Sequence, residues 1–537
     1  MDCGETGESS DEDECLDMES SPTDISGQGI SRDVYKSKKC KIELSNASNG
    51  DRIVKLLVDE RKGWKLGPFK RADIKWMGSG DDDEKLDILQ TKKGSIINYY
   101  PFVKTVAHKD SLKSMMDLCR CFNKEAYEFV PFTFVLPRES EEFNDYSKKR
   151  KNALYIAKPS SGSQGDNMML FKDAKDIPNF KYNGKEFVVQ RYIDNPLLIN
   201  GFKFDLRIYV VVTGIEDGRM HAFLADEGLA RFCTEKYSKP TKDNFRKLYM
   251  HLTNYSLNKL SDNYIEDTSV EDILKPNNAT KRTLAALFQE ILLHSNDPGI
   301  VDEIKKNIQK TCSSTMAVLS NMIMLHANPQ TSTNPTKKAF VGTPFQIYGF
   351  DVLIDSSLKA WLLEINDHPS LNSLLCKAFM GCNHKDCPVS PVDEYVKKQV
   401  ISDSIDLMMK AKRIDIENID DRFNNMQRVF PSEDSDDQMM FESIREIRYF
   451  FLDISKGKPT LSSSDFEQRM LKSLFIVKSC GFKRVDLTLT FQKVSGKERS
   501  VEFFGFLKLL YCLKLRCETV LEVNQGTLVD FIFKLTS

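Results

Sequence analysis

The sequence predicts an α/β protein, and three stretches carry this prediction. Residues 350–365 hold two apolar-rich runs separated by a short polar segment, which is the pattern of a β-hairpin. Residues 202–212 alternate charged and apolar side chains with the period of a strand. Residues 279–325 contain two segments with apolar residues at helical spacing, and their Leu and Met stripes are expected in the core.

The predicted hairpin gathers carboxylates on one face. With a four-residue loop, Asp355 pairs with Ala360 and Asp351 faces Glu364, while Asn366 shares the face of Glu364. The opposite face is then apolar and directed to the core, and comprises Phe350, Val352, Ile354, Trp361, Leu363 and Ile365. Two carboxylates about 4 Å apart repel by about 4 kcal/mol at an effective dielectric near 20. A magnesium ion with bound phosphates offsets such repulsion, and a solvated polar face is the alternative.

Composition excludes several classes of protein. The 537 residues suffice for about two to four domains, and the net charge of −2 gives no general attraction to nucleic acid. Because no apolar run approaches about 18 residues, no membrane span is expected. The acidic residues 1–50 lack the apolar core of a signal peptide and are predicted to be disordered. Thirteen cysteines without a secretion signal indicate reduced thiols in the cytosol.

One cysteine-rich stretch leaves a metal site open. Cys376, Cys382, His384 and Cys387 offer three thiols and an imidazole within twelve residues, a set that can hold zinc. Their spacings match no common zinc knuckle, and the segment has the composition of a loop. Ordinary reduced cysteines are therefore the expectation.

Residues 51–150 are predicted to form a small α/β domain. A short strand is expected at 74–76, a helix at 109–123 and an extended segment at 129–137, where two prolines exclude a helix. None of these elements alone indicates a chemistry.

A possible nucleotide site begins after the next predicted strand, at 153–157. Lys158 follows this strand and is succeeded by the small residues of 159–166, which can close over phosphates through backbone N–H groups. Most loops of this kind are only turns. The buried strand at 186–193 is interrupted by Gln190 and Arg191, and in a nucleotide enzyme its backbone can face the edge of an adenine.

The charges on residues 202–212 need partners. Lys203, Asp205 and Arg207 share one face of a strand that continues as Tyr-Val-Val-Val, and buried charges are costly unless they are paired. One interpretation is a cationic clamp for phosphates in which Asp205 orients the two cations. The other is a surface strand with a salt-bridged stripe.

In this order, the segments resemble the tubulin–tyrosine ligase-like family of ATP-grasp ligases. The resemblance covers residues 70–410 and rests on PFTFVLPRE, KPSSGSQGDN, VVQRYIDNPLLINGFKFDLRIYV, HLTNYSLNK and FQIYGFDVLID…AWLLEINDHPS. It implies an ATP-grasp ligase core with a central subdomain at 151–200 and a C-terminal subdomain with the metal site at 201–400. The small α/β domain precedes this core, and a mainly helical extension follows it.

The resemblance also implies ligands for ATP and Mg²⁺. The residues that would contact or support the nucleotide are Lys158, Gln164, Gly165, Gln190, Arg191, Tyr192, Ile193, Lys203, Asp205, Thr253 and Asn254. Among them, residues 190–193 would form the adenine hinge. The magnesium ligands would be Asp351, Glu364 and Asn366. Lys109 lies where the family often has a basic residue.

The implied reaction joins a carboxylate to an amino acid through an acyl-phosphate. Arg207 and Arg231 would neutralise the reacting carboxylate and its acyl-phosphate, and Arg231, Tyr255 and Lys397 would contact substrate. The implied partners are the acidic tails of tubulin or microtubules and a free amino acid. The implied location is the cytoplasm and the cytoskeleton, with the cilium or flagellum as a candidate.

The identity of the added amino acid is less certain from the motifs. HLTNYSLNK and the segment around Lys397 resemble the polyglutamylase branch, which favours glutamate. Asp367 would repel an incoming glutamate, and an insertion at 374–388 separates two motifs, so glycine stays open. A microtubule-binding protein without catalysis is a further alternative, although every charged residue that the chemistry needs is present. A ligase for a small molecule is the remotest alternative.

The remaining chain divides into two predicted parts. Residues 401–438 are expected to be an acidic linker, and residues 439–537 a helical region that resembles a degenerate pair of EF-hands. Calcium is not expected, because lysine, serine and arginine replace carboxylates in both loops: Lys456, Lys458, Ser495, Lys497 and Arg499. The excess of basic residues in this region fits either a basic face for an acidic microtubule lattice or a plain solvated surface.

Overall fold

The fold is described from a computed structural model. It covers residues 39–45, 47–68, 71–78, 94–100, 107–159, 168–177, 186–214, 220–327, 343–375, 387–496 and 498–536. Most of the N-terminal segment predicted to be disordered lies outside these residues. Its predicted end at residue 50 is too late, since a strand already runs over Cys40–Glu43.

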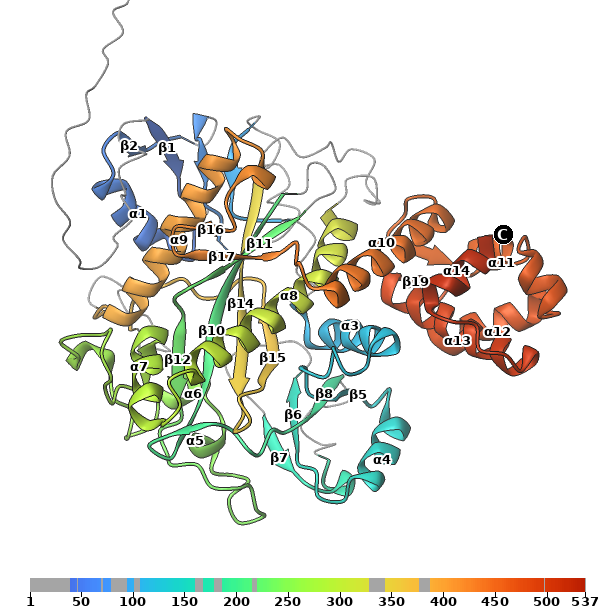
Figure 1. Ribbon diagram of the computed structural model, residues 1–537, viewed down its shortest axis with the longest axis horizontal. Helices are drawn as coiled ribbons and strands as arrows, with labels where there is room; N and C mark the ends of the chain where they lie inside the picture. Colours follow the sequence, from blue (N-terminus) through green and yellow to red (C-terminus); the bar gives the residue numbers. More distant parts are fainter. Residues whose placement is uncertain are drawn as a thin grey trace, which may run out of the picture. The chain divides into compact units, whose positions relative to one another are not determined.

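The first described elements form one edge of a large sheet (Figure 1). They are β1 (Cys40–Glu43), α1 (Asp51–Glu60), β2 (Trp64–Leu66), β3 (Ile74–Lys75) and β4 (Ile96–Ile97). The strands pair in parallel in the order β4-β3-β1-β2, and β4 pairs with a strand at 343–354. The predicted domain at 51–150 therefore has no sheet of its own.

A second, four-stranded sheet follows. Its elements are α3 (Lys109–Phe122), β5 (Thr133–Leu136), α4 (Ser140–Lys149), β6 (Tyr155–Pro159), β7 (Met169–Phe171) and β8 (Phe187–Arg191). The strands are antiparallel in the order β5-β8-β6-β7, and α4 packs its buried Phe143 against Tyr155 and Phe171. Because β5 belongs to this sheet, the boundary predicted at residue 150 cuts through a single unit.

The large sheet is organised around one long strand, β10. Its further strands are β9 (Leu198–Ile199), β10 (Phe202–Thr213), β11 (His221–Ala225), β12 (Leu229–Phe232), β13 (Lys281–Thr283), β14 (Thr343–Ile354) and β15 (Ala360–Asn366). One edge of β10 pairs with β14, while the other pairs first with β12 and then with β11. The register with β14 runs from Leu206↔Val352 to Thr213↔Phe345.

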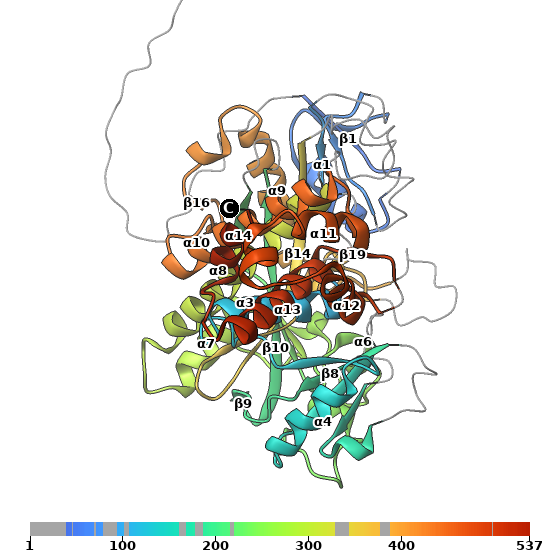
Figure 2. The same ribbon diagram turned by 90° about the vertical axis from the view of Figure 1, so that its right-hand side faces the viewer.

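Helices cover both faces of this sheet (Figure 2). α7 (Leu284–His294) and α8 (Ile300–Ala327) pack on one face, and α1 and α9 (Pro391–Ala411) on the other. The short helices α5 (Leu248–His251) and α6 (Tyr255–Asn258) pack instead with residues of the four-stranded sheet. Alternate residues of β10 serve the two cores: Leu206 and Ile208 pack with α8, whereas Tyr209 and Val211 pack with α9. Within the described part of the chain, no helix combines the length and apolar character needed to cross a bilayer.

The acidic linker predicted at 401–438 is wrong for most of its length. Helix α9 continues to Ala411, and β16 (Arg422–Phe423) and β17 (Met426–Phe430) follow it. β17 pairs with β11 and thereby extends the large sheet. Most of the acidic residues lie on the surface around these elements, but Asp403, Asp406 and Asp437 are buried, and Met426, Val429 and Phe430 enter the core.

The helical region consists of two helix–loop–helix units. Its elements are α10 (Ser435–Ser455), β18 (Thr460–Ser462), α11 (Ser463–Met470), the π-helix η9 (Phe475–Ser479), α12 (Arg484–Ser495), β19 (Ser500–Glu502), α13 (Phe503–Leu521) and α14 (Leu528–Thr536). β18 and β19 pair antiparallel and join the two loops. In the first loop the ammonium of Lys456 contacts Asp465 at 2.7 Å. Lys497 lies outside the described residues, and the EF-hand assignment stays a prediction.

The hairpin differs from its prediction in the loop. Ile354, not Asp355, pairs with Ala360, so the loop has five residues. A bulge in β15 then restores the predicted pairing of Asp351 with Glu364. As a result Leu362 is buried in the core, while Leu363 turns to the opposite face. Trp361 was also predicted to face the core; instead it donates to the Asp355 carboxylate at 2.9 Å.

The junction between α8 and α10 supports a stability prediction. Asp437 is 1% exposed and accepts hydrogen bonds from Ser313 and Ser314, each at 2.7 Å, and an ion pair from Lys310 at 3.2 Å. Asp437→Ala removes the acceptor of Ser314, whereas Ser313 keeps the Lys310 carbonyl and Lys310 keeps Asp434, and we expect a loss of about 1–3 kcal/mol in the free energy of unfolding. Urea unfolding measures it, with exposed Glu433→Ala as the control; equal midpoints for the two variants contradict the prediction.

Candidate active site

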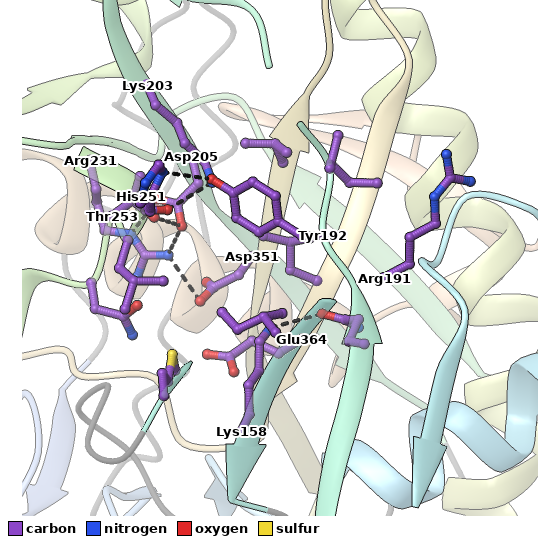
Figure 3. Close-up of a pocket in the computed structure, with 18 residues that line it drawn as sticks. Lys158, Arg191, Tyr192, Lys203, Asp205, Arg231, His251, Thr253, Asp351 and Glu364 are labelled. Carbon is purple, nitrogen blue, oxygen red and sulfur yellow. Dashed lines mark hydrogen bonds and ion pairs between the residues drawn. The ribbon is translucent and has the colours of Figure 1, made fainter. Parts of the chain in front are cut away.

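A cleft lies between the four-stranded sheet and the strands β10, β14 and β15 (Figure 3). The residues that line it come from both sheets and from the segment 251–254: Ile156, Lys158, Met168, Gln190, Arg191, Tyr192, Ile193, Lys203, Asp205, Arg231, His251, Leu252, Thr253, Asn254, Asp351, Leu353, Leu363 and Glu364.

Strand register brings four charged side chains together at the base of the cleft. Arg207 pairs across strands with Asp351, and Asp205 pairs with Arg231. The Arg207 guanidinium donates to Asp351 at 2.6 and 3.2 Å, and that of Arg231 donates to Asp205 at 2.8 and 2.7 Å. Arg231 also reaches Asp351 at 2.9 Å. Asp351, which is 4% exposed, is therefore shared by two guanidinium groups.

Glu364 stands opposite Asp351 on the hairpin and has its own cation. Lys109, the first residue of α3, places its Nζ atom 3.3 Å from the Glu364 carboxylate. The three acids Asp205, Asp351 and Glu364 are thus balanced by Arg207, Arg231 and Lys109.

Two further lysines in the cleft bond to uncharged groups. Lys158 donates to the side-chain oxygen of Gln190 at 2.8 Å, and Gln190 in turn donates to Thr133 at 3.1 Å. Lys203 donates to the hydroxyl of Tyr192 at 2.9 Å and to the backbone carbonyl of His251 at 2.8 Å. Both ammonium groups are buried, at 7% and 6% exposure.

Burial changes the protonation of these groups. It lowers the pKa of Lys158 to about 8; the nearby cations Lys109 and Lys203 act in the same direction, while Glu364 and Asp351 oppose it. Burial likewise lowers the pKa of Lys203 to about 8. Burial alone would raise the pKa of Asp351, but Arg207 and Arg231 overcome it and hold that pKa well below its usual range. Asp351 is therefore an anion and the lysines are cations at neutral pH.

A glycine makes the central ion pair possible. A Cβ atom at Gly349 would lie 2.9 Å from Cδ of Arg207 and 2.8 Å from Cβ of Pro369. Arg207 therefore crosses the strand over Gly349 on its way to Asp351.

Most of the predicted nucleotide residues do line the cleft. Lys158, Lys203, Asp205, Thr253, Asn254 and the four residues 190–193 are among its walls, together with Arg231, Asp351 and Glu364. The side chain of Arg191 points away from the others in Figure 3, so only its backbone can serve a ligand there. Gln164 and Gly165 lie outside the described residues.

Four predicted residues are not among the cleft walls. Arg207 lies behind Asp351, and Asn366 pairs with Gly349 and donates to its carbonyl at 3.3 Å. Tyr255 stacks on the Lys281 ammonium, 4.7 Å from its ring centre. Lys397 is 4% exposed; it contacts Asp393 at 2.8 Å and the carbonyl of Asn372 at 2.6 Å.

Six residues that line the cleft were not predicted as site residues: Ile156, Met168, His251, Leu252, Leu353 and Leu363. His251 closes the cleft beside Lys203, and burial together with that ammonium lowers its pKa to about 4. Leu353 and Leu363 provide an apolar wall. The string HLTNY was a visible signal for His251, whereas the bulge that turns Leu363 inward has no local sequence signal.

The donor set fits magnesium. Asp351 and Glu364 supply anionic oxygens from adjacent strands, and Mg²⁺ in proteins is commonly held by one or two carboxylates with substrate phosphates. Among the described residues, no group of three or more His, Cys, Asp or Glu is placed to hold a metal on its own. Of the candidate zinc ligands only Cys387 is described, and Cys376, Cys382 and His384 lie outside the described residues.

The fold and the position of the cleft between two sheets identify this molecule as an α/β protein of the ATP-grasp class. Residues 88–379, more than half of the chain, match the tubulin-tyrosine ligase family. The chain belongs to that family, whose ligases depend on ATP in general.

Several curated relatives are similar to this chain. The mouse tubulin polyglutamylase TTLL13 is 34% identical over 325 residues, which is 58% of this chain and 38% of the mouse protein. Human tubulin polyglutamylase TTLL6 is 36% identical over 53% of this chain and 30% of its own length. A probable beta-tubulin polyglutamylase of Tetrahymena thermophila is 31% identical over 73% and 30%. The matched region thus spans about a third of the length of these relatives.

The close packing of Arg207 over Gly349 leads to a second stability prediction. Gly349→Ala places a methyl group against Arg207 and Pro369, and we expect a loss of about 1–3 kcal/mol in the free energy of unfolding because neither neighbour can yield freely. Gly299→Ala is the control, since its Cβ would meet only the side chain of Asp297 at 3.3 Å. Urea unfolding compares them, and an unchanged midpoint for Gly349→Ala excludes the close approach.

Proposed function

We propose that this protein is an ATP-dependent ligase that joins glutamate to the carboxylates of tubulin tails. One observation supports the proposal: two carboxylates on paired strands share a single cleft with two buried lysines and Arg231, and Arg207 bonds to Asp351 from behind the cleft wall. This is the inventory that transfer of a phosphoryl group to a carboxylate requires.

The nucleotide would lie between the two sheets. Lys158 and Lys203 would contact its phosphates, since both project buried ammonium groups that are bonded only to neutral acceptors in the contacts described above. The backbone of residues 190–193 would meet the edge of the adenine, with Leu353 and Leu363 against its faces. Thr253 would act indirectly, by donating to Asp205 at 2.6 Å. Asn254 lines the same wall.

Magnesium would be held by Asp351 and Glu364, with Asn366 at the end of the same strand, and would supply charge neutralisation to the phosphates. The chain's own part is to keep Asp351 ionised. Arg207 and Arg231 do this for Asp351 through the low pKa that they impose.

The reaction needs no nucleophilic side chain. A substrate carboxylate attacks the γ-phosphorus of ATP, ADP leaves, and an acyl-phosphate forms; the amine of the amino acid then attacks the acyl carbon and inorganic phosphate leaves. Arg231, on the cleft wall, and Arg207 behind Asp351 would offset the charge of the carboxylate and its acyl-phosphate. Catalysis is then positioning and electrostatic stabilisation.

Glutamate is the favoured amino acid for two reasons. The similar proteins cited above are named polyglutamylases, and Lys397 and Lys281 share the buried Asp393 next to Tyr255, which leaves this cluster with one excess positive charge. Asp367, which would repel glutamate, is bonded to His368 at 2.9 Å. Glycine remains the competing donor.

Tubulin is the proposed acceptor, and free glutamate the proposed donor. Acidic tails complement a cleft whose wall carries Arg231, Lys158 and Lys203, and the relatives named above carry tubulin in their names. The protein would accordingly act in the cytoplasm at the cytoskeleton, including cilia or flagella. Neither nucleic acid nor membrane is proposed as a partner.

The test is an amino-acid panel. Purified protein is incubated with microtubules, ATP, magnesium and one radiolabelled amino acid at a time, and we expect incorporation of glutamate well above glycine. Incorporation of glycine alone would assign a glycine ligase. No incorporation from any amino acid, on tubulin from several sources, would leave only the non-catalytic microtubule-binding function.

A matched variant tests the metal site in the same assay. Glu364→Gln keeps the size of the side chain and removes one charge, so we expect at least a 100-fold loss of incorporation and no thermal stabilisation by magnesium ATP. Asp355→Asn, on the same hairpin but bonded to its own loop, is the control. Equal stabilisation of wild type and Glu364→Gln would remove Glu364 from the site.

The low lysine pKa values predict a pH dependence of nucleotide binding. Lys158 and Lys203 are cations below about pH 8 and lose their protons above it, so affinity for ATP should be constant up to pH 7.5 and fall about 10-fold or more by pH 9. Binding of a fluorescent ATP analogue measures this. Lys158→Met should bind more weakly at pH 7 and lose less between pH 7 and 9, and an unchanged slope contradicts the assignment.

A further inference from the structure

The cations that would receive an acidic substrate are already bonded to the carboxylates that would receive the metal. Arg207 directs Nε and Nη2 to the two oxygens of Asp351, and Arg231 adds a third bond to the same carboxylate. Lys109 is paired with Glu364 in the same way. The proposed metal-binding carboxylates and the proposed substrate-binding cations are therefore not independent sites, because each group is bonded to the other.

We propose that the site works by exchange of partners. When Asp351 and Glu364 take up a divalent cation, Arg207 and Lys109 give up those carboxylates, and only then can an acidic substrate replace Asp351 as the partner of Arg207. The inference rests on the proposed function and adds an order to it: magnesium nucleotide first, acidic substrate second.

The charge balance supports this order. The acids Asp205, Asp351 and Glu364 and the bases Arg207, Arg231 and Lys109 cancel, so a substrate carboxylate beside the hairpin meets no net attraction from these six groups. The two buried lysines of the cleft, Lys158 and Lys203, are the cations that the nucleotide phosphates would take. The substrate carboxylate would instead add a third negative charge next to Asp351 and Glu364. A divalent cation on the hairpin reverses this balance.

Lys158 and Lys203 differ from Arg207 and Lys109, because neither lysine is bonded to a carboxylate in the described part of the chain. Binding of the nucleotide can therefore precede binding of the acidic substrate. Lys158 and Lys203 bond to the neutral groups of Gln190, Tyr192 and His251, so a phosphate can take their charge without breaking an ion pair. These two cations are therefore available to the nucleotide before any metal binds. The acidic substrate can bind Arg207 only after Asp351 has released it.

The two arginines also differ in the bonds that remain when Asp351 binds the metal. Arg231 retains a bidentate bond to Asp205, at 2.8 and 2.7 Å, and Thr253 donates to Asp205 from behind. Its guanidinium thus stays oriented when Asp351 is withdrawn. Arg207 has Asp351 as its bidentate partner and is the group that changes partner.

Binding of a labelled hexaglutamate peptide tests the order without turnover. Fluorescence anisotropy is measured with wild-type protein in EDTA, and then with magnesium and a non-hydrolysable ATP analogue. We expect at least 10-fold tighter binding in the second condition. Equal affinity in both conditions overturns the proposal, whatever the catalytic activity of the protein.

A variant gives the sharper test, because it predicts a gain. Asp351→Asn removes the charge that occupies Arg207, so the peptide should bind in EDTA at least 10-fold more tightly than to wild type and should gain nothing from magnesium nucleotide. Asp355→Asn removes one charge from the same hairpin away from the arginines, and should behave as wild type. Unchanged or weaker binding by folded Asp351→Asn overturns the proposal.

The outcomes separate this inference from the proposed function. If the protein ligates glutamate but binds the peptide equally well without metal, the proposed function holds and the partner exchange is wrong. If Asp351→Asn binds the peptide more tightly but the protein incorporates no amino acid, the partner exchange holds and the proposed function is wrong. If Asp351→Asn fails to fold by circular dichroism, the wild-type comparison alone decides.

Discussion

The structure depends on one carboxylate shared by two guanidinium groups in the middle of a sheet. Asp351 lies on β14 beside β10, is almost fully buried, and would carry a prohibitive desolvation cost if Arg207 and Arg231 did not reach it. This requirement links three strands at once: Asp351 lies on β14, Arg207 comes from β10 and Arg231 from β12. A shift of any of these strands by one residue would turn its charged side chain to the apolar face and leave the others unpaired.

The same strand supplies both the site and the core. On one face of β10 the residues Lys203, Asp205 and Arg207 give way to Tyr209 and Val211, which pack with α9, so the polar face passes into an apolar one along a single strand. On the other face the apolar residues continue without interruption and pack with α8. The polar half is where β12 pairs, and the apolar half is where β11 pairs. The cleft is therefore confined to one end of β10, and the rest of the strand anchors it.

The sequence predicted what depends on local alternation and missed what depends on distant packing. The faces of β10 and the pairing of Asp351 with Glu364 followed from period two, although the loop was one residue longer and a bulge in β15 compensated for it. Leu363 was assigned to the wrong face because a bulge is set by the partner strand. The segment 401–438 was predicted to be a linker because its many acidic residues outweigh the few apolar residues of β17. That strand nevertheless pairs with β11 and extends the large sheet. No spacing could indicate that Lys109 meets Glu364, since 254 residues separate them and only the packing of α3 joins them.

The site also depends on chain that lies beyond residue 379, where the family match ends. Helix α3 carries Lys109 at its first residue and, one turn later, Lys113, which bonds to Glu139 at 2.6 Å. Lys508 of α13 approaches the same carboxylate at 3.9 Å, and the apolar residues of α3 belong to one continuous core with those of α8, α10 and α13. Asp437 holds α10 to α8 from the other side. Helix α3 therefore has one end beside the cleft, where Lys109 meets Glu364, and its flank against α13, so the helical region packs directly on the helix that positions this lysine.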